Sequence, residues 1–578
     1  MSLSDTTPPT RLAGYDLDPT VFRPETDWTT PQTPFEGRLL RQAEQARARA
    51  KPRAASLASA PPAPAVTHTS LTPAQRVLSQ AEAHHLLRRI QHNAPPGAVA
   101  ALTGQPIETV VGSLVAEAVA LDPVPEPDWI DTPIPSRNDA EAFQAFIENN
   151  TLWLTETRYN AWTWLLSRGL RERMTLFWHD HFATEAQIYQ LASFAFRYLA
   201  LLREHAFGNF QTFVHAVGTD AAMLLYLNGN QNERSAPNEN YARELLELFT
   251  MGPTRPDGTP NYTDVGEVPS GQSDVEMVAR ALTGWVIDGT TLDVLFLPFR
   301  HDDGPKTIFG QTGPYGYDEV IDLLFRERTE AIAYFICAKL YQDLVYETVN
   351  EEVVEAMAAL FIERGFEIRP VVEALLMSEH FYDPALIGAQ IKSPTDVLVG
   401  FLRETGTEAP LEIQRILTFG GFLLDQNLLD PPNVAGWPGY RDWVDTSTLP
   451  LRWLLTEYLL FGAEVMPPLD LVPMALDLHD PAQPGAVFYL AEAMATHLLA
   501  VPLDTVQLEV SDEPFTGNLV DNPIPDDILQ GPPHRLALTK VMLAGVPWYE
   551  WDLSIALANN YLLLFTRYLI QLPEYQLG

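Results

Sequence analysis

Histidine and glutamate side chains, which bind metal ions and transfer protons, gather in a few short segments of this sequence. The segment 178–182, Trp-His-Asp-His-Phe, places His179 and His181 two residues apart at the end of a predicted apolar helix. Residues two apart point away from each other on a helix, so both rings could bind one metal ion only if the helix has ended there. The alternative is one packed and one exposed histidine.

The segment 238–249 is predicted to form an amphipathic helix. Winding it at about 100° per residue gathers Glu239, Arg243 and Glu244 on its polar side. One interpretation is a solvated ladder of ion pairs that also includes Glu247, worth on the order of a few tenths of a kcal/mol per pair. The other is that Glu239 and Glu244 line a buried polar pocket that holds a cation or performs acid–base chemistry.

Two further histidines have both a chemical and a structural interpretation. His301 and Lys306 flank the turn residues 302–305, Asp-Asp-Gly-Pro, which brings an imidazole, carboxylates and an ammonium into one loop. Asp and Gly are also favoured in turns for backbone reasons alone. His205, at the end of its predicted helix, could simply donate to the terminal carbonyl groups.

The segment 431–439, Pro-Pro-Asn-Val-Ala-Gly-Trp-Pro-Gly, is too rich in proline and glycine to be a helix or a central strand. We expect a rigid loop that either forms the wall of a pocket or covers the core. The single cysteine, Cys337, rules out a disulfide framework and a cysteine-cage metal site within the chain. Nucleotide-binding, esterase-type and common metalloprotease motifs are absent from the sequence.

The elements that must position these residues are predicted to be helices. Apolar residues at steps of three or four predict a helix over 185–203, Asn209 is expected to cap the next one, and Ser273 with Glu276 has the pattern of a capping box. We therefore predict an all-α fold, mainly a helical bundle, with one small β-hairpin near residues 292–310.

Composition divides the chain into three predicted parts. Residues 1–70 are rich in proline and alanine, have little to bury, and are predicted to be a disordered arm. Residues 71–465 are predicted to be the helical core domain. Residues 466–578 are predicted to be a helical C-terminal extension with proline-rich connectors and no chemical motif.

The charge balance excludes several classes of partner. The 578 residues include 37 Lys plus Arg against 75 Asp plus Glu, a formal net charge of -38, which opposes binding to nucleic acid or anionic lipid. No apolar run reaches the roughly 18 residues that a membrane span requires. No signal peptide is readable, so we expect a cytoplasmic protein by default.

Seven segments, in this order, give the chain a resemblance to a known family. They are 178–182, 205–210, 237–250, 279–285, 301–307, 391–394 and 431–439. On these segments, within a stretch from about His84 to Trp453, the chain resembles the large bacterial domain-of-unknown-function family numbered 1800. The resemblance implies a mostly helical protein and, in many relatives, export and a neighbouring gene for a sulfatase-like protein. It supplies no established reaction.

Because these segments resemble landmarks of one fold, we expect their polar residues to converge. The first hypothesis is a metal-assisted enzyme, hydrolytic or oxidative, in which histidines hold a divalent metal ion, one glutamate is the base, and Lys306 or Arg243 stabilises an anion. The predicted metal ligands are His179, His181, His205 and His301, and the predicted catalytic residues are Glu239, Glu244, Lys306 and Arg243. The second hypothesis is a non-catalytic binding or assembly protein that works with a partner such as the sulfatase-like protein.

Overall fold

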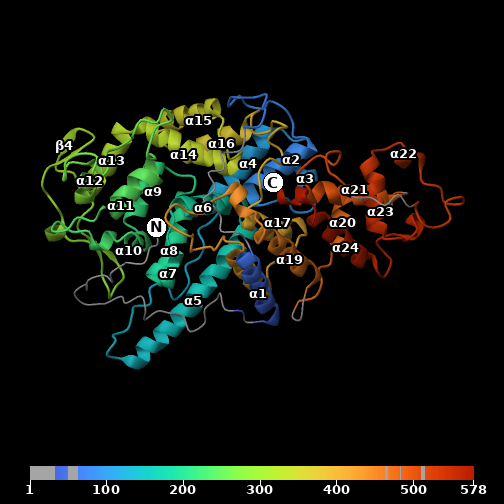
Figure 1. The fold of residues 1–578 in the computed structure, drawn as a ribbon, viewed down its shortest axis with the longest axis horizontal. Helices are drawn as coiled ribbons and strands as arrows, with labels where there is room; N and C mark the ends of the chain where they lie inside the picture. The colour runs from blue at the N-terminus through green and yellow to red at the C-terminus, as the bar shows by residue number, and fades with distance from the viewer. Residues whose placement is uncertain are drawn as a thin grey trace.

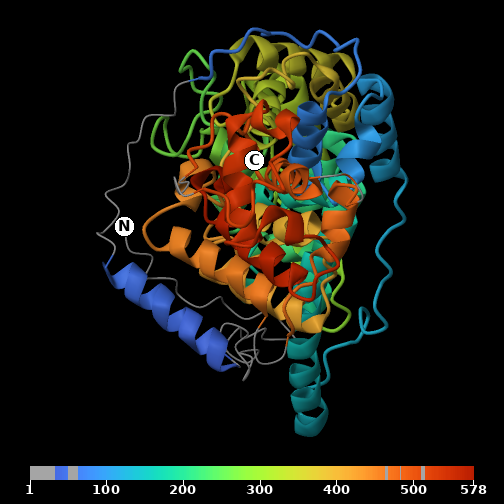
Figure 2. The same cartoon turned by 90° about the vertical axis from the view of Figure 1, so that its right-hand side faces the viewer.

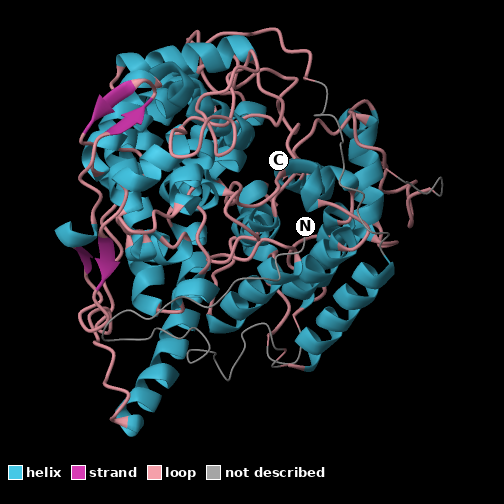
Figure 3. Cartoon of the chain, turned by 60° about the vertical axis from the view of Figure 1, so that its left-hand side comes forward, coloured by secondary structure: helices cyan, strands magenta, loops and turns pink. Residues whose placement is uncertain are grey.

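The computed structural model describes residues 31, 33–49, 63–462, 466–481, 483, 485–508 and 514–578. Within these residues the chain is mainly helical, with 24 α-helices and two small antiparallel sheets of two strands each (Figures 1 and 3). The prediction of a mainly helical fold with a small β-hairpin is confirmed. No helix in the described ranges combines the length and the apolar character that crossing a bilayer requires.

The bounds of the elements fall into three sets. The helices up to residue 281 are α1 (Pro34–Arg49), α2 (Gln80–Gln91), α3 (Ala98–Leu102), α4 (Ile107–Ala120), α5 (Ala140–Ser167), α6 (Gly169–His181), α7 (Ala186–Tyr189), α8 (Ala192–His205), α9 (Phe210–Gly218), α10 (Ala221–Tyr226), η1 (Gly229–Gln231), α11 (Glu239–Glu244), the π-helix η2 (Leu245–Thr250) and α12 (Asp274–Ala281). The strands with η3, and then seven α-helices with η4, make up the rest of the central part: β1 (Trp285–Ile287), β2 (Val294–Phe296), η3 (Pro298–Arg300), β3 (Lys306–Ile308), β4 (Gln311–Gly313), α13 (Tyr317–Glu327), α14 (Thr329–Leu344), α15 (Glu351–Glu363), α16 (Ile368–Met377), α17 (Pro394–Glu404), α18 (Leu411–Leu423), η4 (Tyr440–Trp443) and α19 (Thr448–Phe461). The last set is α20 (Val472–Leu478), α21 (Ala486–Leu498), α22 (Asp526–Leu529), α23 (Pro533–Leu543), η5 (Trp548–Glu550), α24 (Ala558–Ile570) and η6 (Pro573–Gln576).

Helix α6 lies inside the bundle. It packs against α2, α4, α5 and α8, while α17 packs against α5, α18 and α19. Helices α14, α15 and α16 form a layer along the upper edge in Figure 1, and α16 packs against α4. The helices α20 to α24 lie at one end of the molecule, opposite α10 to α13 (Figure 1). Helix α1 lies on the outside, against α18 and α19 (Figure 2).

The predicted capping residues start their helices as expected. The side chain of Asn209 accepts a hydrogen bond from the backbone of α9, and Ser273 with Glu276 forms the capping box of α12. Ser393 makes the same kind of box at the start of α17, where Pro394 occupies the first helical position. These caps satisfy backbone N–H groups that a helix start otherwise leaves without a partner.

The predicted helix over 185–203 is interrupted, and this part of the prediction is wrong. Gln190 has a left-handed backbone (φ 54), which separates α7 from α8. Asn150, on α5, holds this break from both sides: its Nδ2 donates to the Gln190 carbonyl at 2.8 Å, and its Oδ1 accepts from the backbone N–H of Ala192 at 2.9 Å. A distant side chain thus replaces the missing helical hydrogen bonds.

The two strands predicted as one hairpin belong to two hairpins. Strand β1 pairs with β2, and β3 pairs with β4. The turn between β3 and β4 is formed by Phe309 (φ 50) and Gly310 (φ 78), and both positive φ values are typical of a two-residue hairpin. Between β2 and β3, the two carboxyl oxygens of Asp302 accept hydrogen bonds from Arg280 at 2.7 and 3.1 Å. This pair anchors the loop to α12.

Residues 1–70, predicted to be a disordered arm, are described only in part. Residues 34–49 form α1, in which Leu39 and Ala43 are buried and Glu36 lies 3.0 Å from Arg415. Residues 1–30, 32 and 50–62 lie outside the described residues.

Buried charged groups join the end of the chain to the central helices. The hydroxyl of Tyr575 donates to Glu404 Oε2 at 2.7 Å, and Lys392 Nζ lies 3.5 Å from Glu404 Oε1. The same Nζ lies 3.7 Å from the centre of the Tyr575 ring. The side chains of Lys392 and Glu404 are 2% and 0% exposed, so each charge depends on its partner for the solvation that water would give.

We expect Lys392→Met to lower the free energy of unfolding by about 3–5 kcal/mol, because it leaves the Glu404 carboxylate buried without its cation. Urea denaturation measures this change. Arg567→Met is the matched control, since it breaks the exposed 3.1 Å pair with Glu457 and is expected to cost less than about 1 kcal/mol. Equal losses in the two variants would contradict the assignment.

Candidate functional site

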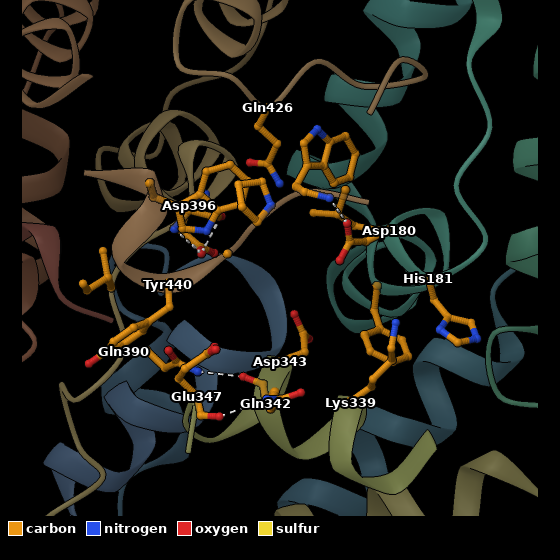
Figure 4. A pocket seen from close by; sticks show the side chains of 18 of the residues that line it. Asp180, His181, Lys339, Gln342, Asp343, Glu347, Gln390, Asp396, Gln426 and Tyr440 are labelled. Carbon is orange, nitrogen blue, oxygen red and sulfur yellow. Dashed lines mark hydrogen bonds between the residues drawn. The ribbon is translucent and has the colours of Figure 1, made fainter. Parts of the chain in front are cut away.

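A polar cavity of about 270 Å³ lies where α2, α6, α14 and the start of α17 meet the loop 431–439 (Figure 4). Its charged lining residues are Arg89, Arg173, Asp180, Lys339, Asp343, Glu347 and Asp396. Amide and aromatic side chains complete the wall, namely Gln342, Gln390, Gln426, Phe177, Trp437, Tyr440 and Trp443. This concentration of polar groups around one hollow makes it the candidate site.

The two histidines that end α6 bind backbone groups of distant segments. His179 Nε2 accepts the N–H of Leu429 at 2.9 Å, and His181 Nε2 donates to the carbonyl of Phe249, in η2, at 3.0 Å. Burial lowers the pKa of His179 to about 4 and that of His181 well below its ordinary value, so both rings are neutral. The segments 178–182 and 237–250 therefore do meet, but through a ring and a backbone carbonyl.

Asp180, between these histidines, faces the cavity (Figure 4). Its Oδ1 accepts the backbone N–H of Trp437 at 2.6 Å. Burial raises the pKa of Asp180 to about 7, and the charge of Asp343 adds to this, while the Trp437 N–H and the charge of Lys339 oppose it. The carboxyl group can therefore hold or release a proton near neutral pH.

Lys339, on α14, is a cation whose charge acts on Asp180. Burial lowers its pKa, and the charge of Asp180 opposes this shift. Its Nζ lies 5.2 Å from the centre of the Phe335 ring, and no carboxylate among the described residues lies within ion-pair distance of it. Asp180 and Lys339 thus influence each other without forming a salt bridge.

Arg173 forms ion pairs with two carboxylates that line the cavity. It donates to Asp343 Oδ1 at 2.8 Å and to Asp396 Oδ1 at 3.3 Å. Burial alone would raise the pKa of Asp396, but the charge of Arg173 and hydrogen bonds from His92 and Ser393 hold it well below its ordinary value. The second oxygen of Asp343, Oδ2, is buried without a hydrogen-bond partner among the described residues.

The loop 431–439 forms a wall of the cavity, which decides between the two alternatives for this segment. Gly436 (φ +83) lies directly against Asp180, since a Cβ atom at this position would be 2.3 Å from Asp180 Oδ1. Only glycine allows this approach, and the approach brings the Trp437 N–H onto the carboxylate.

The predicted glutamate helix makes a separate group of contacts. Arg243 lies 3.6 Å from Glu239 and 3.0 Å from Asp264, and the Glu247 carboxylate accepts the hydroxyl of Tyr262 at 3.0 Å. The ion-pair ladder therefore forms only between Glu239 and Arg243. Glu244, next to it, is half-buried, and burial raises its pKa, with a further contribution from the charge of Glu247.

The remaining predicted residues lie in other surroundings. The ring of His205 stacks on Phe213 with centroids 5.1 Å apart. His301 Nδ1 lies 2.9 Å from the carbonyl oxygen of Thr283. Lys306 is buried and its Nζ donates to backbone carbonyls of the preceding turn.

Among the described residues, no three or more His, Cys, Asp or Glu side chains form a group that could hold a metal ion. The rings of the four predicted histidine ligands contact separate backbone groups and rings. Of the eight predicted site residues, His181 is the one that lines the cavity.

Sequence reasoning missed the carboxylates and the lysine that do face the cavity. Asp180 lies between two histidines, and the chemical role of this segment was assigned to the histidines alone. Lys339 and Asp343 lie four residues apart on α14 among apolar residues, where a charged residue at an inward position is itself a signal of a polar site.

We expect Gly436→Ala to displace the loop, because the added Cβ would overlap Asp180, and to lower the free energy of unfolding by about 2–4 kcal/mol. Gly439→Ala is the matched control: it also has a positive φ (+70) but open space around its Cβ position, so it carries only the backbone penalty, of about 1–3 kcal/mol. Thermal and urea unfolding measure both. A Gly436 variant no less stable than the Gly439 variant would show that the loop does not rest on Asp180.

The family model described as Protein of unknown function (DUF1800) matches residues 85–577. The match continues through the part predicted as a C-terminal extension, beyond the seven segments. Neither the curated proteins nor the solved structures contain a match to this chain.

Proposed function

The chain belongs to the family of proteins of unknown function numbered 1800, and because that family assigns no reaction, we propose from the cavity that it is a hydrolytic enzyme. One observation carries this proposal: two carboxyl groups of different character face one polar cavity. Asp180 has a pKa raised to about 7, whereas Asp343 is ion-paired to Arg173 through one oxygen. Carboxyl pairs with environments that differ in this way divide into an acid and a base.

Asp180 is the proton donor in this proposal, and Asp343 is the base. The bond between the substrate's reacting centre and its leaving group breaks as a water oxygen bonds to that centre. Asp180 gives its proton to the leaving group, and Asp343 Oδ2, which has no hydrogen-bond partner among the described residues, takes a proton from the water. Exchange with solvent then returns each carboxyl group to its starting state.

Lys339 supports this chemistry as a positive charge that has no salt-bridge partner among the described residues. A cation in a largely buried site stabilises negative charge that develops on the substrate more strongly than it would in water. Its charge also lowers the pKa of Asp180, which keeps the proton within reach of release near neutral pH.

A second candidate function is the non-catalytic binding or assembly protein. The contacts of His179, Asp180 and His181 support it, because each side chain holds a backbone group and would stabilise the fold with or without a reaction. The partner predicted from the resemblance, a sulfatase-like protein, stays a prediction. So does the divalent metal, which the assay below tests separately by chelation and re-addition of Mg²⁺, Mn²⁺ or Zn²⁺.

We expect Asp180→Asn to lower kcat/KM by about 10²–10⁴-fold on whichever chromogenic glycoside, ester or phosphate the full chain hydrolyses. Because protonated Asp180 is the acid, wild-type activity should fall as the pH rises through about 7, and the variant should lose this dependence. Asp303→Asn, in an exposed turn, is the control and should keep wild-type activity. Wild-type turnover in the Asp180 variant, or no hydrolysis of any substrate class by the wild type, would favour the non-catalytic function.

A further inference from the structure

The cavity presents hydrogen-bond donors and acceptors that have no partner in the part of the chain that the structure describes. Gln426 Oε1 accepts the backbone N–H of Thr395 at 2.9 Å, so its amide Nε2 remains as a donor, and the side chain points into the cavity (Figure 4). The Lys339 ammonium is a second donor. Asp343 Oδ2 and the second carboxyl oxygen of Asp180 are acceptors without a hydrogen bond to a described residue. A ligand that satisfies this set must both give and accept hydrogen bonds around its perimeter.

Aromatic side chains also line the same cavity. Trp437 and Trp443 are each 7% exposed, and both line it next to Tyr440. The hydroxyl of Tyr440 lies 3.1 Å from that of Tyr346, so this ring is held in place as part of the wall. Rings in the wall of a pocket offer apolar surface beside its polar groups.

The volume of about 270 Å³ is close to the lower end of the roughly 300–1,000 Å³ typical of ligand pockets, which favours a single ring over a long chain. A hydroxyl group is both donor and acceptor, and the carbon face of a sugar ring is apolar. We propose that the cavity binds a polyhydroxylated ring, that is, a monosaccharide or one sugar unit of a larger glycan. This inference rests on the proposed function, since it names the substrate class of the same site.

Saturation-transfer NMR and titration on the full chain test the proposal, with D-glucose, D-galactose, D-mannose and their methyl glycosides as probes. At least one sugar should bind, and cyclohexanol, which offers a ring with a single hydroxyl, should bind at least tenfold more weakly. Asp343→Asn and Lys339→Met should each weaken sugar binding about five- to tenfold or more. Asp303→Asn should leave it unchanged.

Three results would overturn the ligand class: no binding of any sugar to the wild-type chain, equal binding of cyclohexanol, or preferential binding of a zwitterion such as glutamine. The sugar panel on the wild type keeps the test decisive even if a variant fails to fold. Sugar binding without hydrolysis of any glycoside, ester or phosphate would support the ligand class and contradict the hydrolase. Hydrolysis of esters without sugar binding would support the hydrolase and contradict the ligand class.

Discussion

Three hydrogen bonds from consecutive side chains at the end of α6 organise the site. His179 accepts from the backbone near residue 429, Asp180 accepts from the loop 431–439, and His181 donates to the π-helix η2. Neighbouring positions on a helix point in different directions, so one short segment can bind three others. Each of these backbone groups is buried, and each would lack a partner if its side chain were lost. The end of this one helix therefore positions the segments that surround the cavity.

Buried charge explains why one carboxyl group differs from the others. Arg173 lies between Asp343 and Asp396 and gives each a cation within 3.3 Å, which offsets part of the cost of removing them from water. Asp180 receives one backbone N–H and no cation at ion-pair distance among the described residues. Burial consequently favours its protonated form, and its pKa rises to about 7. The unequal pairing of these carboxylates is the physical origin of the proposed acid and base.

Much of the architecture could be predicted from local sequence, and the site could be predicted only in part. Caps such as Asn209 and Ser273 and the wall formed by 431–439 depend on residue type and neighbours, which a sequence displays. The break at Gln190 depends on a distant asparagine, which the local sequence does not reveal. The turn at Phe309 and Gly310 depends on a positive φ that is uncommon for phenylalanine, and residue type alone does not predict it. The two histidines two residues apart suggested a metal site. Their partners in the structure are a backbone N–H and a backbone carbonyl, which residue types do not reveal. Spacing located the segment and could not give the direction of each side chain.

Direct titration of Asp180 tests whether the cavity holds a carboxyl group that is protonated near neutral pH. The infrared carboxyl band of protein labelled with ¹³C-aspartate, taken as the difference between wild type and Asp180→Asn, reports the protonation of this one group as the pH is changed. We expect a midpoint near pH 7, because burial without an ion-pair partner favours the neutral acid. A midpoint near the ordinary value of 3.8 would mean that Asp180 is solvated or paired, and that the cavity lacks the proposed acid.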